Sequence, residues 1–310
     1  MPEGVAPPLR VWLTISAFRS DDALAQLLEQ ASQLVPLPFE RVLVVDSLGS
    51  GAIPKLIAER GWSWASYESA DENLGSAGNL ARRLARAAAA GADYAYALNH
   101  DGRLDAETIS ALLEEARRNP DLGALYPLRR LVNRGGRFDV TGRLPWPVPR
   151  IAVRKPPSAP TFGVFWGSSN GTLYSLAPVR AGLTPWADLW MGFEDLGYGW
   201  LLTEKGYRQV VVKSALFEDG YEFKAVMGGA VHRSDKPAWY SYYFARNLIL
   251  VARRTHQGAA TFAALGLRIA MESVVSATLR PNRGERLRLI GRGLLDGLRG
   301  KSGFTHSPRR

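Results

Sequence analysis

The chain contains no cysteine. Disulfide bridges, thiolate metal sites and thiol nucleophiles are therefore excluded at the outset, and a cytoplasmic setting is permitted. A secretory signal is not expected, because the N-terminus carries acid and proline in place of a basic stretch followed by an apolar run. A membrane span is not expected either. The most apolar stretch after the N-terminus, 259–279, contains Arg268 and Glu272, whereas a span needs about 20 largely uncharged residues.

The overall composition is that of a folded globular protein. Apolar residues make up 46% and charged residues 22% of the 310 positions. The net charge of +10 is unevenly placed, because 282–310 contains many arginines and only two acidic residues, Glu285 and Asp296. A segment of this kind binds anionic lipid or nucleic acid, or is simply a solvated face, and both interpretations stay open.

The first 130 residues alternate between short apolar runs and amphipathic stretches. The apolar runs predict buried strands at 11–17 and 41–45 and two further strands at 63–67 and 94–98. Helical spacing with capping residues predicts helices at 21–31, 53–60, 76–90 and 105–118. This alternation is typical of an α/β fold with a mostly parallel central sheet and helices on both faces. Such sheets bind ligands beyond the carboxyl ends of their strands.

The second half of the chain is less regular. The stretch 132–160, rich in Gly, Pro and Arg, predicts a long loop excursion with a small hairpin around its paired glycines, Gly135 and Gly136. Sequence patterns typical of ordered structure resume after Phe162, and two helices are predicted at 237–254 and 259–279. Beyond them, 280–299 mixes arginines with leucines, which is typical of a basic amphipathic helix. We expect this region to lie on an anionic membrane surface or to pack on the α/β part or on a second subunit.

Two segments that follow predicted strands suit a nucleotide. Asp46, followed by Ser47, ends a buried strand, where a carboxylate contacts a base or ribose or merely caps the loop. In the segment from Asn73 to Asn79, two glycines and two amides open a helix, so the backbone there can approach phosphate closely. Glycine-rich helix starts are common, and neither segment decides the function alone.

Two further segments carry carboxylates. Asn99-His100-Asp101 follows the fourth strand, and a hard cation that bridges a diphosphate needs only one or two protein carboxylates. The other interpretation of this segment is an Asx turn. Glu194 and Asp195 are adjacent, and buried like charges raise one another's pKa, which favours a general base. The alternative is a helix N-terminus that carries acids.

The order of these motifs resembles the large inverting family of glycosyltransferases with the GT-A fold, often called family 2. The resemblance covers 11–303 and rests on segments in a fixed order: 14–18, 46–50, 73–79, 99–101, 168–174, 194–195, 206–207, His232 and 242–247. Within the family the chain most resembles the rhamnosyltransferase-like branch, also in its tail, 293–300. Asn99 stands where the first Asp of an Asp-x-Asp motif is expected, and Gly197 replaces a second acid that many members have.

The resemblance implies a particular division of the chain. It implies a GT-A catalytic domain at 9–235, with a donor-binding half at 9–130 and an acceptor-side half at 160–235. A C-terminal helical region follows at 236–303, in contact with a membrane or with a second subunit.

The resemblance also implies roles for individual residues. Asp195 is the expected general base with Glu194 beside it, and Asp101 and His232 are the expected ligands of Mn²⁺ or Mg²⁺. The residues expected at the donor are Thr14, Ser16, Phe18, Asp46, Ser47, Asn73, Gly75, Asn79, Asn99, His100 and Asp101. Those expected on the acceptor side are Trp166, Ser169, Asn170, Gly171, Trp190 and Glu194. Tryptophans flank these segments and either stack on sugar or pack the core: Trp166, Trp186 and Trp190.

The implied function is transfer of a sugar from a UDP-, dTDP- or GDP-linked donor to an acceptor hydroxyl, with inversion at the anomeric carbon. Bacterial surface polysaccharide or glycolipid assembly is the expected setting, with a glycan or a lipid-linked acceptor. We expect a cytoplasmic enzyme, peripheral on the inner face of the cell membrane if the basic helices bind it. A homo-oligomer is compatible with the sequence, and no nucleic-acid partner is expected.

Other functions fit the residues less well. A nucleotidyltransferase on a similar sheet would need a glycine-rich basic loop after the first strand, where the chain instead has Ala17 to Ser20. A nucleic-acid-binding module would spread Lys and Arg with aromatics over one face, but here the arginines are mostly late in the chain. A weak or inactive relative that only binds nucleotide sugars stays open because of Asn99 and Gly197.

Overall fold

The computed structural model describes residues 8–34, 38–220, 223–226, 231–234 and 236–306, and for 223–226 and 231–234 it describes only the backbone. The strands are β1 (Val11–Phe18), β2 (Arg41–Ser47), β3 (Ala65–Ala70), β4 (Tyr94–Asn99), β5 (Leu122–Leu131), β6 (Arg137–Asp139), β7 (Ala152–Val153), β8 (Thr161–Gly163), β9 (Thr172–Ser175), β10 (Arg208–Asp219), β11 (Phe223–Val226) and β12 (Val231–Ser234). The helices are α1 (Asp21–Ser32), α2 (Ala52–Glu59), α3 (Gly75–Ala89), α4 (Ala106–Arg118), α5 (Ala177–Arg180), α6 (Glu194–Glu204), α7 (Tyr240–Arg254), α8 (Ala259–Leu279) and α9 (Arg283–Leu298).

Most of the strands join one sheet, in the order β3-β2-β1-β4-β9-β5-β10-β8. The first four are parallel to one another, and β5 is parallel to β10. β9 runs antiparallel to both of its neighbours, and β8 runs antiparallel to β10. The predicted α/β class is confirmed, but the sheet is mixed, because a short return strand lies near its middle.

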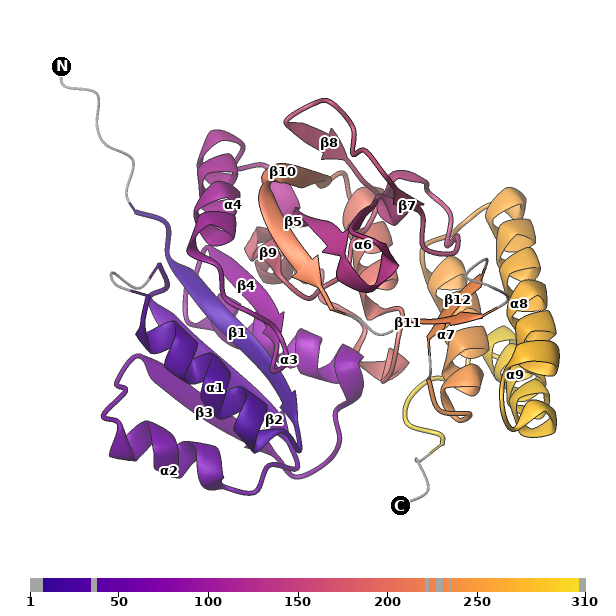
Figure 1. The fold of residues 1–310 in the computed structure, drawn as a ribbon, viewed down its shortest axis with the longest axis horizontal. Coiled ribbons are helices and arrows are strands. Elements are labelled where there is room, and N and C mark those ends of the chain that lie inside the picture. The colour runs from indigo at the N-terminus through magenta and orange to yellow at the C-terminus, as the bar shows by residue number, and fades with distance from the viewer. Residues whose placement is uncertain (1–7, 35–37, 221–222, 227–230, 235, 307–310) are drawn as a thin grey trace.

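Helices cover both faces of this sheet (Figure 1). On one face α1, α2 and α4 pack against the strands, through Leu24, Ile53 and Ile109 among others. On the other face α3, α5 and α6 do so, with Leu84 and Leu202 in the core. Because both of their faces are covered, β1 and β2 are near-continuous apolar runs, which is why the sequence pattern identifies them.

The third strand lies further along the chain than predicted. It was expected at 63–67 and is found at Ala65–Ala70. Gly61 is left-handed, with φ +63°, and Ser63 lies in the turn that follows it. Glu68 is polar, but among the described strands β3 lies at the edge and pairs with β2 alone, so a polar residue is accommodated there.

The hairpin predicted around Gly135 and Gly136 is present. β5 and β6 pair antiparallel across it, with Leu131 opposite Arg137, and both glycines have positive φ. β6 in turn pairs with β7, so short strands connect the loop excursion to the main sheet.

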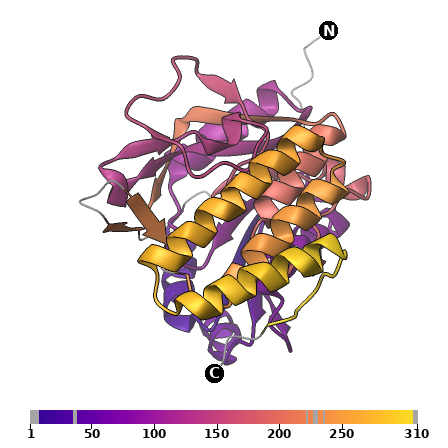
Figure 2. The same ribbon diagram turned by 90° about the vertical axis from the view of Figure 1, so that its right-hand side faces the viewer.

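Three helices follow the sheet and lie on one side of the molecule (Figures 1 and 2). α7 is buried along most of its length and shares an apolar cluster with α6, through Leu196 and Trp200 of the latter. α8 and α9 pack on the same cluster from outside, through Leu265, Ile269 and Ile290. Both predicted helices are confirmed, and the basic stretch after them is the helix α9.

In the described part of the chain, α8 alone is long and apolar enough to cross a membrane, with a mean hydropathy of 1.4. Only 17% of its most apolar stretch is buried. One such helix is weak support for a span, and Arg268 and Glu272 interrupt its apolar sequence. The residues on the two faces of α8 are therefore more informative than its mean hydropathy.

α3 begins where two distant segments approach closely. Gly75 has φ +65°, and a Cβ added to it would collide with the carbonyl oxygen of Trp190. The same carbonyl accepts a hydrogen bond from the N–H of Ala77 (3.1 Å), and the indole Nε1 of Trp190 donates to the carbonyl of Asn73 (2.8 Å). The glycine therefore allows the loop before α6 to lie against the first turn of α3.

Replacing Gly75 with alanine should destabilise the protein more than the same change at Gly51. Both glycines have positive φ, but a Cβ on Gly51 meets no atom within 4 Å. The left-handed conformation alone costs alanine about 1–2 kcal/mol, and the collision with Trp190 should add about 1–3 kcal/mol. Urea denaturation of the two variants measures the difference, and equal losses would contradict a tight contact at Gly75.

Candidate active site

The carboxyl ends of β1, β2 and β4 lie side by side, because these strands are parallel and in register. Ser16 is opposite Asn99, and Ala17 is opposite Asp46. Phe18, the last residue of β1, is 39% exposed at the same edge. Polar residues from distant parts of the sequence therefore meet at one edge of the sheet, as predicted.

Asp46 is fully buried at this edge. Its Oδ2 accepts a hydrogen bond from the hydroxyl of Tyr67 (3.0 Å), whereas its Oδ1 is buried and meets no partner in the described structure. Burial raises the pKa of Asp46, against the lowering effect of the Tyr67 hydroxyl. Gly49 leaves room for this pair, because a Cβ there would collide with both side chains. A buried oxygen left unpaired is a position where a ligand can donate a hydrogen bond.

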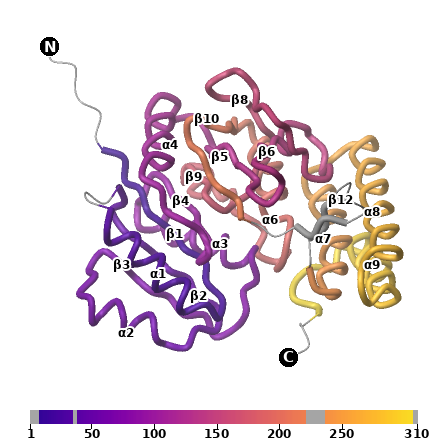
Figure 3. The backbone as a smooth tube through the Cα atoms, in the orientation of Figure 1, coloured from indigo at the N-terminus to yellow at the C-terminus, as the bar shows by residue number. Residues whose placement is uncertain are grey.

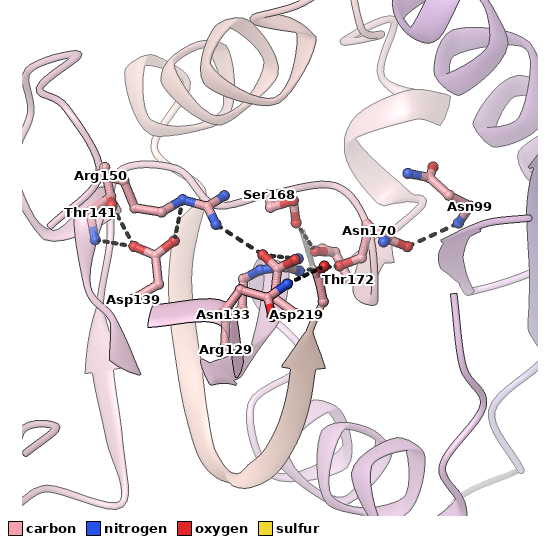
Figure 4. A network of polar contacts seen from close by, with 11 residues as sticks. Asn99, Arg129, Asn133, Asp139, Thr141, Arg150, Ser168, Asn170, Thr172 and Asp219 are labelled. Carbon is pink, nitrogen blue, oxygen red and sulfur yellow. Dashed lines mark hydrogen bonds and ion pairs between the residues drawn. The ribbon is translucent and has the colours of Figure 1, made fainter. Parts of the chain in front are cut away.

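The segment after β4 connects the two expected halves of the site. The hydroxyl of Ser16 donates to Oδ1 of Asn99 (3.3 Å), and the backbone N–H of His100 donates to the carbonyl of Ser16 (2.9 Å). The backbone N–H of Asn99 donates to Oδ1 of Asn170 (2.9 Å), so the expected acceptor-side segment lies directly beside it (Figure 4). The side chain of Asp101 is exposed at the rim.

Several residues expected at the donor hold elements of the fold together. Thr14 is fully buried within β1. Asn79 is 3% exposed, and its side-chain amide donates to the carbonyl of Val45 (2.8 Å), which ties α3 to β2. The side-chain oxygens of Ser47 and Asn73 accept hydrogen bonds from nearby backbone N–H groups. Their contacts in this structure are structural, and their donor-binding roles stay predictions.

The Glu194–Asp195 pair occupies the first turn of α6. Oδ1 of Asp195 accepts a hydrogen bond from the N–H of Leu196 (2.7 Å), whereas Oε2 of Glu194 is buried and meets no partner in the part of the chain described. Burial raises the pKa of Glu194 to about 7, and the charge of Asp195 adds to the rise. Burial also raises the pKa of Asp195, although arginines across the pocket oppose this. A carboxyl group that titrates near neutrality suits proton transfer at physiological pH.

Both carboxylates lie in a pocket of about 1060 Å³. This is at the upper end of ligand pockets, which span about 300–1,000 Å³, so there is room for two substrates. Its walls come from the end of β4, from the segments 139–150 and 164–170, from β10, and from the C-terminal helices. α7 and α8 contribute several lining residues: Tyr240, Ser241, Phe244, Arg268, Met271, Glu272 and Val275.

One wall is a buried ionic network that sequence reasoning missed (Figure 4). Arg129 donates to the carboxylate of Asp219 (3.0 Å) and to the carbonyl of Asn170 (2.6 Å). Arg150 donates to the same Asp219 oxygen (2.9 Å) and pairs with Asp139 (3.2 Å). The network joins β5, β10 and the loop excursion around the segment that carries Asn170. These residues are far apart in the sequence, and no sequence motif links them.

The three tryptophans differ in position. Trp166 is one of the described lining residues of the pocket. Trp190 is 4% exposed, and its ring packs on that of Tyr243 at 4.8 Å between centroids. Trp186 is partly buried under the guanidinium of Arg254. Trp190 therefore serves packing in this structure, and a sugar platform is a suitable role only for Trp166.

The expected acceptor-side segment lies on the pocket wall. Ser169 and Asn170 line the pocket, whereas Gly171 is buried behind them. Gly171 has φ +82°, and a Cβ added to it would press on the ring of Phe217 at 2.6 Å. This glycine therefore turns the chain into β9 and fixes the two pocket residues before it.

The loop that leads into α6 has an unusual backbone. Trp190 and Phe193 both have positive φ, +58° and +65°, although neither is glycine. Such conformations cost about 1–3 kcal/mol each and persist only where surrounding contacts hold them. Since the Glu194–Asp195 pair follows directly, its position depends on whatever holds this loop.

Two buried residues of α7, Arg246 and Asn247, hold the loop, and we call them the α7 clamp. The side-chain amide of Asn247 contacts three backbone carbonyl oxygens at 2.9–3.0 Å, those of Leu189, Met191 and Gly192. Arg246 donates to the carbonyl of Leu189 (2.8 Å) and to that of Gly303 (2.6 Å). The sequence offered this Arg-Asn pair only as part of the family resemblance. Its contacts show that it positions the loop.

The residues at the rim fit a divalent cation that binds together with a diphosphate. Asp101 is exposed there, and Asn99 also lines the pocket. Among the described residues, no three His, Cys, Asp or Glu come together as a complete metal site. Mg²⁺ is commonly held by one or two carboxylates plus substrate phosphates, which a single Asp can support. His232, the second expected ligand, lies in β12, and its side chain is outside the described part of the structure.

No protein-family model and no curated protein matches the chain by sequence. By structure, TarS of S. aureus (residues 1–349) matches with a TM-score of 0.59 at 12% identity, over 93% of this chain and 81% of that chain. The mannosyltransferase PcManGT from Pyrobaculum calidifontis, in complex with GDP-Man and Mn²⁺, matches with 0.56 at 12% identity, over 94% and 88%. GalNAc-T7 with UDP, GalNAc and Mn²⁺ matches with 0.58 at 10% identity, over 88% and 58%. The chain therefore has the GT-A glycosyltransferase fold, and its C-terminal region is helical.

Replacing Asn247 with leucine should lower the free energy of unfolding by about 2–4 kcal/mol, because buried carbonyl groups lose their donor. Asn119→Leu at the end of α4 is the matched control. Among the described residues its amide bonds to Glu115 alone, so the loss should stay near 0.5 kcal/mol, as is roughly usual near the surface. Chemical denaturation followed by circular dichroism compares the two variants. Similar small losses would mean that Asn247 does not hold the loop.

Glu194→Gln should change how stability depends on pH. Because the pKa of Glu194 is raised from 4.5 to about 7, the native protein keeps a proton that the unfolded chain has released. This contribution to stability is complete below pH 4.5 and is lost as the pH rises through about 7. The variant cannot ionise there, so its stability relative to the wild type should rise over this interval. Parallel urea titrations of both proteins measure it, and identical pH profiles would refute the raised pKa.

Proposed function

We propose that the chain is an inverting glycosyltransferase that moves a sugar from a nucleotide-diphosphate donor to an acceptor hydroxyl. One observation carries the proposal. The Glu194–Asp195 pair shares a large pocket with the carboxyl end of β4, within a GT-A fold. Solved structures of this fold include TarS with UDP-GlcNAc and PcManGT with GDP-Man.

The donor side of the site is the edge formed by β1, β2 and β4. The unpaired oxygen of Asp46 suits a hydrogen bond from the base or ribose of a UDP-, dTDP- or GDP-linked sugar. Asp101, at the rim, would hold Mn²⁺ or Mg²⁺ together with the diphosphate. When bound, such an ion neutralises the charge that develops on the leaving diphosphate.

The acceptor side of the site contains the general base, Asp195. Asp195 removes the proton from an acceptor hydroxyl while that oxygen attacks the anomeric carbon from the face opposite the leaving diphosphate, and this displacement inverts the carbon. Burial raises the pKa of Glu194 to about 7 and the charge of Asp195 adds to the rise, so Glu194 is largely protonated below neutrality. A protonated Glu194 places no second negative charge beside the carboxylate that accepts the proton.

The wider setting is proposed from the order of motifs. The sequence resembles family 2 and its rhamnosyltransferase-like branch, which supports a role in bacterial surface polysaccharide or glycolipid assembly. A glycan or lipid-linked acceptor and a cytoplasmic location belong to the same proposal. A homo-oligomer remains compatible with it.

Asp195→Asn should lower turnover by about 10²–10⁴-fold while nucleotide-sugar binding stays near the wild-type level. Turnover is measured as release of nucleoside diphosphate, and binding as the rise in melting temperature with a nucleotide-sugar panel, with and without Mn²⁺. Asp121→Asn, on the exposed ion pair with Arg208, is the matched control and should keep full activity.

Near-normal turnover by the Asp195→Asn protein would rule out this base. A panel in which no nucleotide sugar raises the melting temperature would reject the donor class. Donor binding without any turnover by the wild type would favour an inactive, sugar-binding relative.

A further inference from the structure

The helix α8 has two unlike faces. Its outward face consists of exposed, uncharged residues at helical spacing: Ala260, Ala263, Leu267, Ala270, Met271, Val274 and Thr278. Leu267 and Val274 are 65% and 62% exposed. The outer face of a helix on a soluble protein ordinarily carries charged residues. An exposed apolar stripe of this length marks an interaction surface.

The charged residues of α8 point to the pocket instead. Arg268 and Glu272 both line it. Glu272 pairs with Arg280 (2.9 Å), but Arg268 makes no hydrogen bond or ion pair within the described part of the chain. The Arg268 guanidinium lies over the ring of Phe244, at 5.6 Å from its centroid. The charge of Glu272 acts on Arg268, but no carboxylate among the described residues is hydrogen-bonded to it. A guanidinium that lines a pocket in this way suits an anionic group on a ligand.

The apolar face and the pocket meet at Met271. This residue is 49% exposed and also lines the pocket. Arg268, Met271 and Val275 follow one another at about one helical turn and all line the pocket, so they form one continuous stripe. An apolar chain that lies along the outside of α8 would pass Met271 and bring its head group to Arg268.

The charge of the C-terminal region indicates which partner covers the apolar face of α8. Residues 236–310 contain 14 lysines and arginines and three acidic residues, a net charge of +11, and the rest of the chain carries −1. α9 lies beside α8 (Figure 2), and its exposed residues mix leucines with arginines: Leu287, Arg288, Arg292, Leu295, Leu298 and Arg299. This mixture is typical of helices that lie in the interface of an anionic bilayer. A second copy would instead bring two strongly positive regions together.

We propose that α8 and α9 dock on an anionic bilayer, and that the acceptor is a lipid in that bilayer whose anionic head group binds Arg268. The inference rests on the proposed function and names the class of its acceptor. α8 then lies along the membrane surface rather than across it, with its apolar stripe in the lipid and its charged residues toward the pocket.

Vesicle sedimentation of the full chain tests the docking. The wild type should bind vesicles in which a quarter of the phosphatidylcholine is replaced by phosphatidylglycerol, and should bind neutral vesicles weakly. Binding should fall as salt screens the arginines. The double variant Leu267→Glu/Val274→Glu should bind at least about tenfold more weakly. Leu216→Glu, at an exposed leucine of β10, is the matched control and should bind like the wild type.

Two results would overturn the docking. One is wild-type protein that stays in solution with anionic vesicles, or a double variant that binds as well as the wild type. The other is a dimer, detected by light scattering, that the double variant dissociates. That result would assign the apolar face to a second copy of the chain.

Calorimetry with farnesyl phosphate, and with farnesol as its neutral counterpart, tests the role of Arg268. Arg268→Gln should lower affinity for farnesyl phosphate by roughly tenfold or more and leave farnesol binding unchanged. Arg268→Lys should recover part of the loss, and vesicle sedimentation of both variants should match the wild type. Equal affinity of Arg268→Gln and wild type for farnesyl phosphate would overturn the head-group assignment. None of these measurements needs a donor or turnover, so they can fail while the donor panel succeeds.

Discussion

One set of buried polar contacts holds the carboxylate pair of the candidate site in place, namely the α7 clamp on the loop before α6. Asn247 and Arg246 bind backbone carbonyl groups of a loop in which two residues other than glycine have positive φ. The loop would relax without such partners, since its conformation is costly by itself. Because Glu194 and Asp195 begin α6 directly after this loop, a helix that follows the α/β part positions the pair. The C-terminal helices thus help to build the candidate site, because α7 holds the loop and α7 and α8 line the pocket.

The parts of the fold that were predictable are those encoded by local pattern. β1 and β2 are buried on both faces and read as apolar runs, and the parallel register then places Ser16, Asp46 and Asn99 at one edge. β9 was not predictable, because it is only four residues long and exists through its pairing with β4 and β5. The edge position of β3 likewise permits polar residues that blur its pattern. Both strands are determined by hydrogen bonding to strands that are distant in the sequence, and a local sequence pattern does not show such pairing.

The candidate site was predictable only where a residue type allows few roles. Adjacent acids at a helix start, Glu194 and Asp195, do line the pocket with raised pKa values. Asn79 suits a ligand equally well in sequence, but the carbonyl of Val45 occupies its amide. Trp190 was expected at the acceptor and is buried instead. The network around Arg129 joins distant segments, so its electrostatic effect on Asp195 appears only in three dimensions.

The pocket draws its walls from separate parts of the chain, and this has a consequence for how the protein can diversify. Strand register fixes the edge formed by β1, β2 and β4, so substitutions there disturb several partners at once. The inward stripe of α8, from Arg268 to Val275, faces the pocket without contributing to the sheet. Changes along that stripe can alter what enters the pocket while the strand ends keep their arrangement. The strand-end part and the α8 part of the candidate site are therefore free to evolve at different rates.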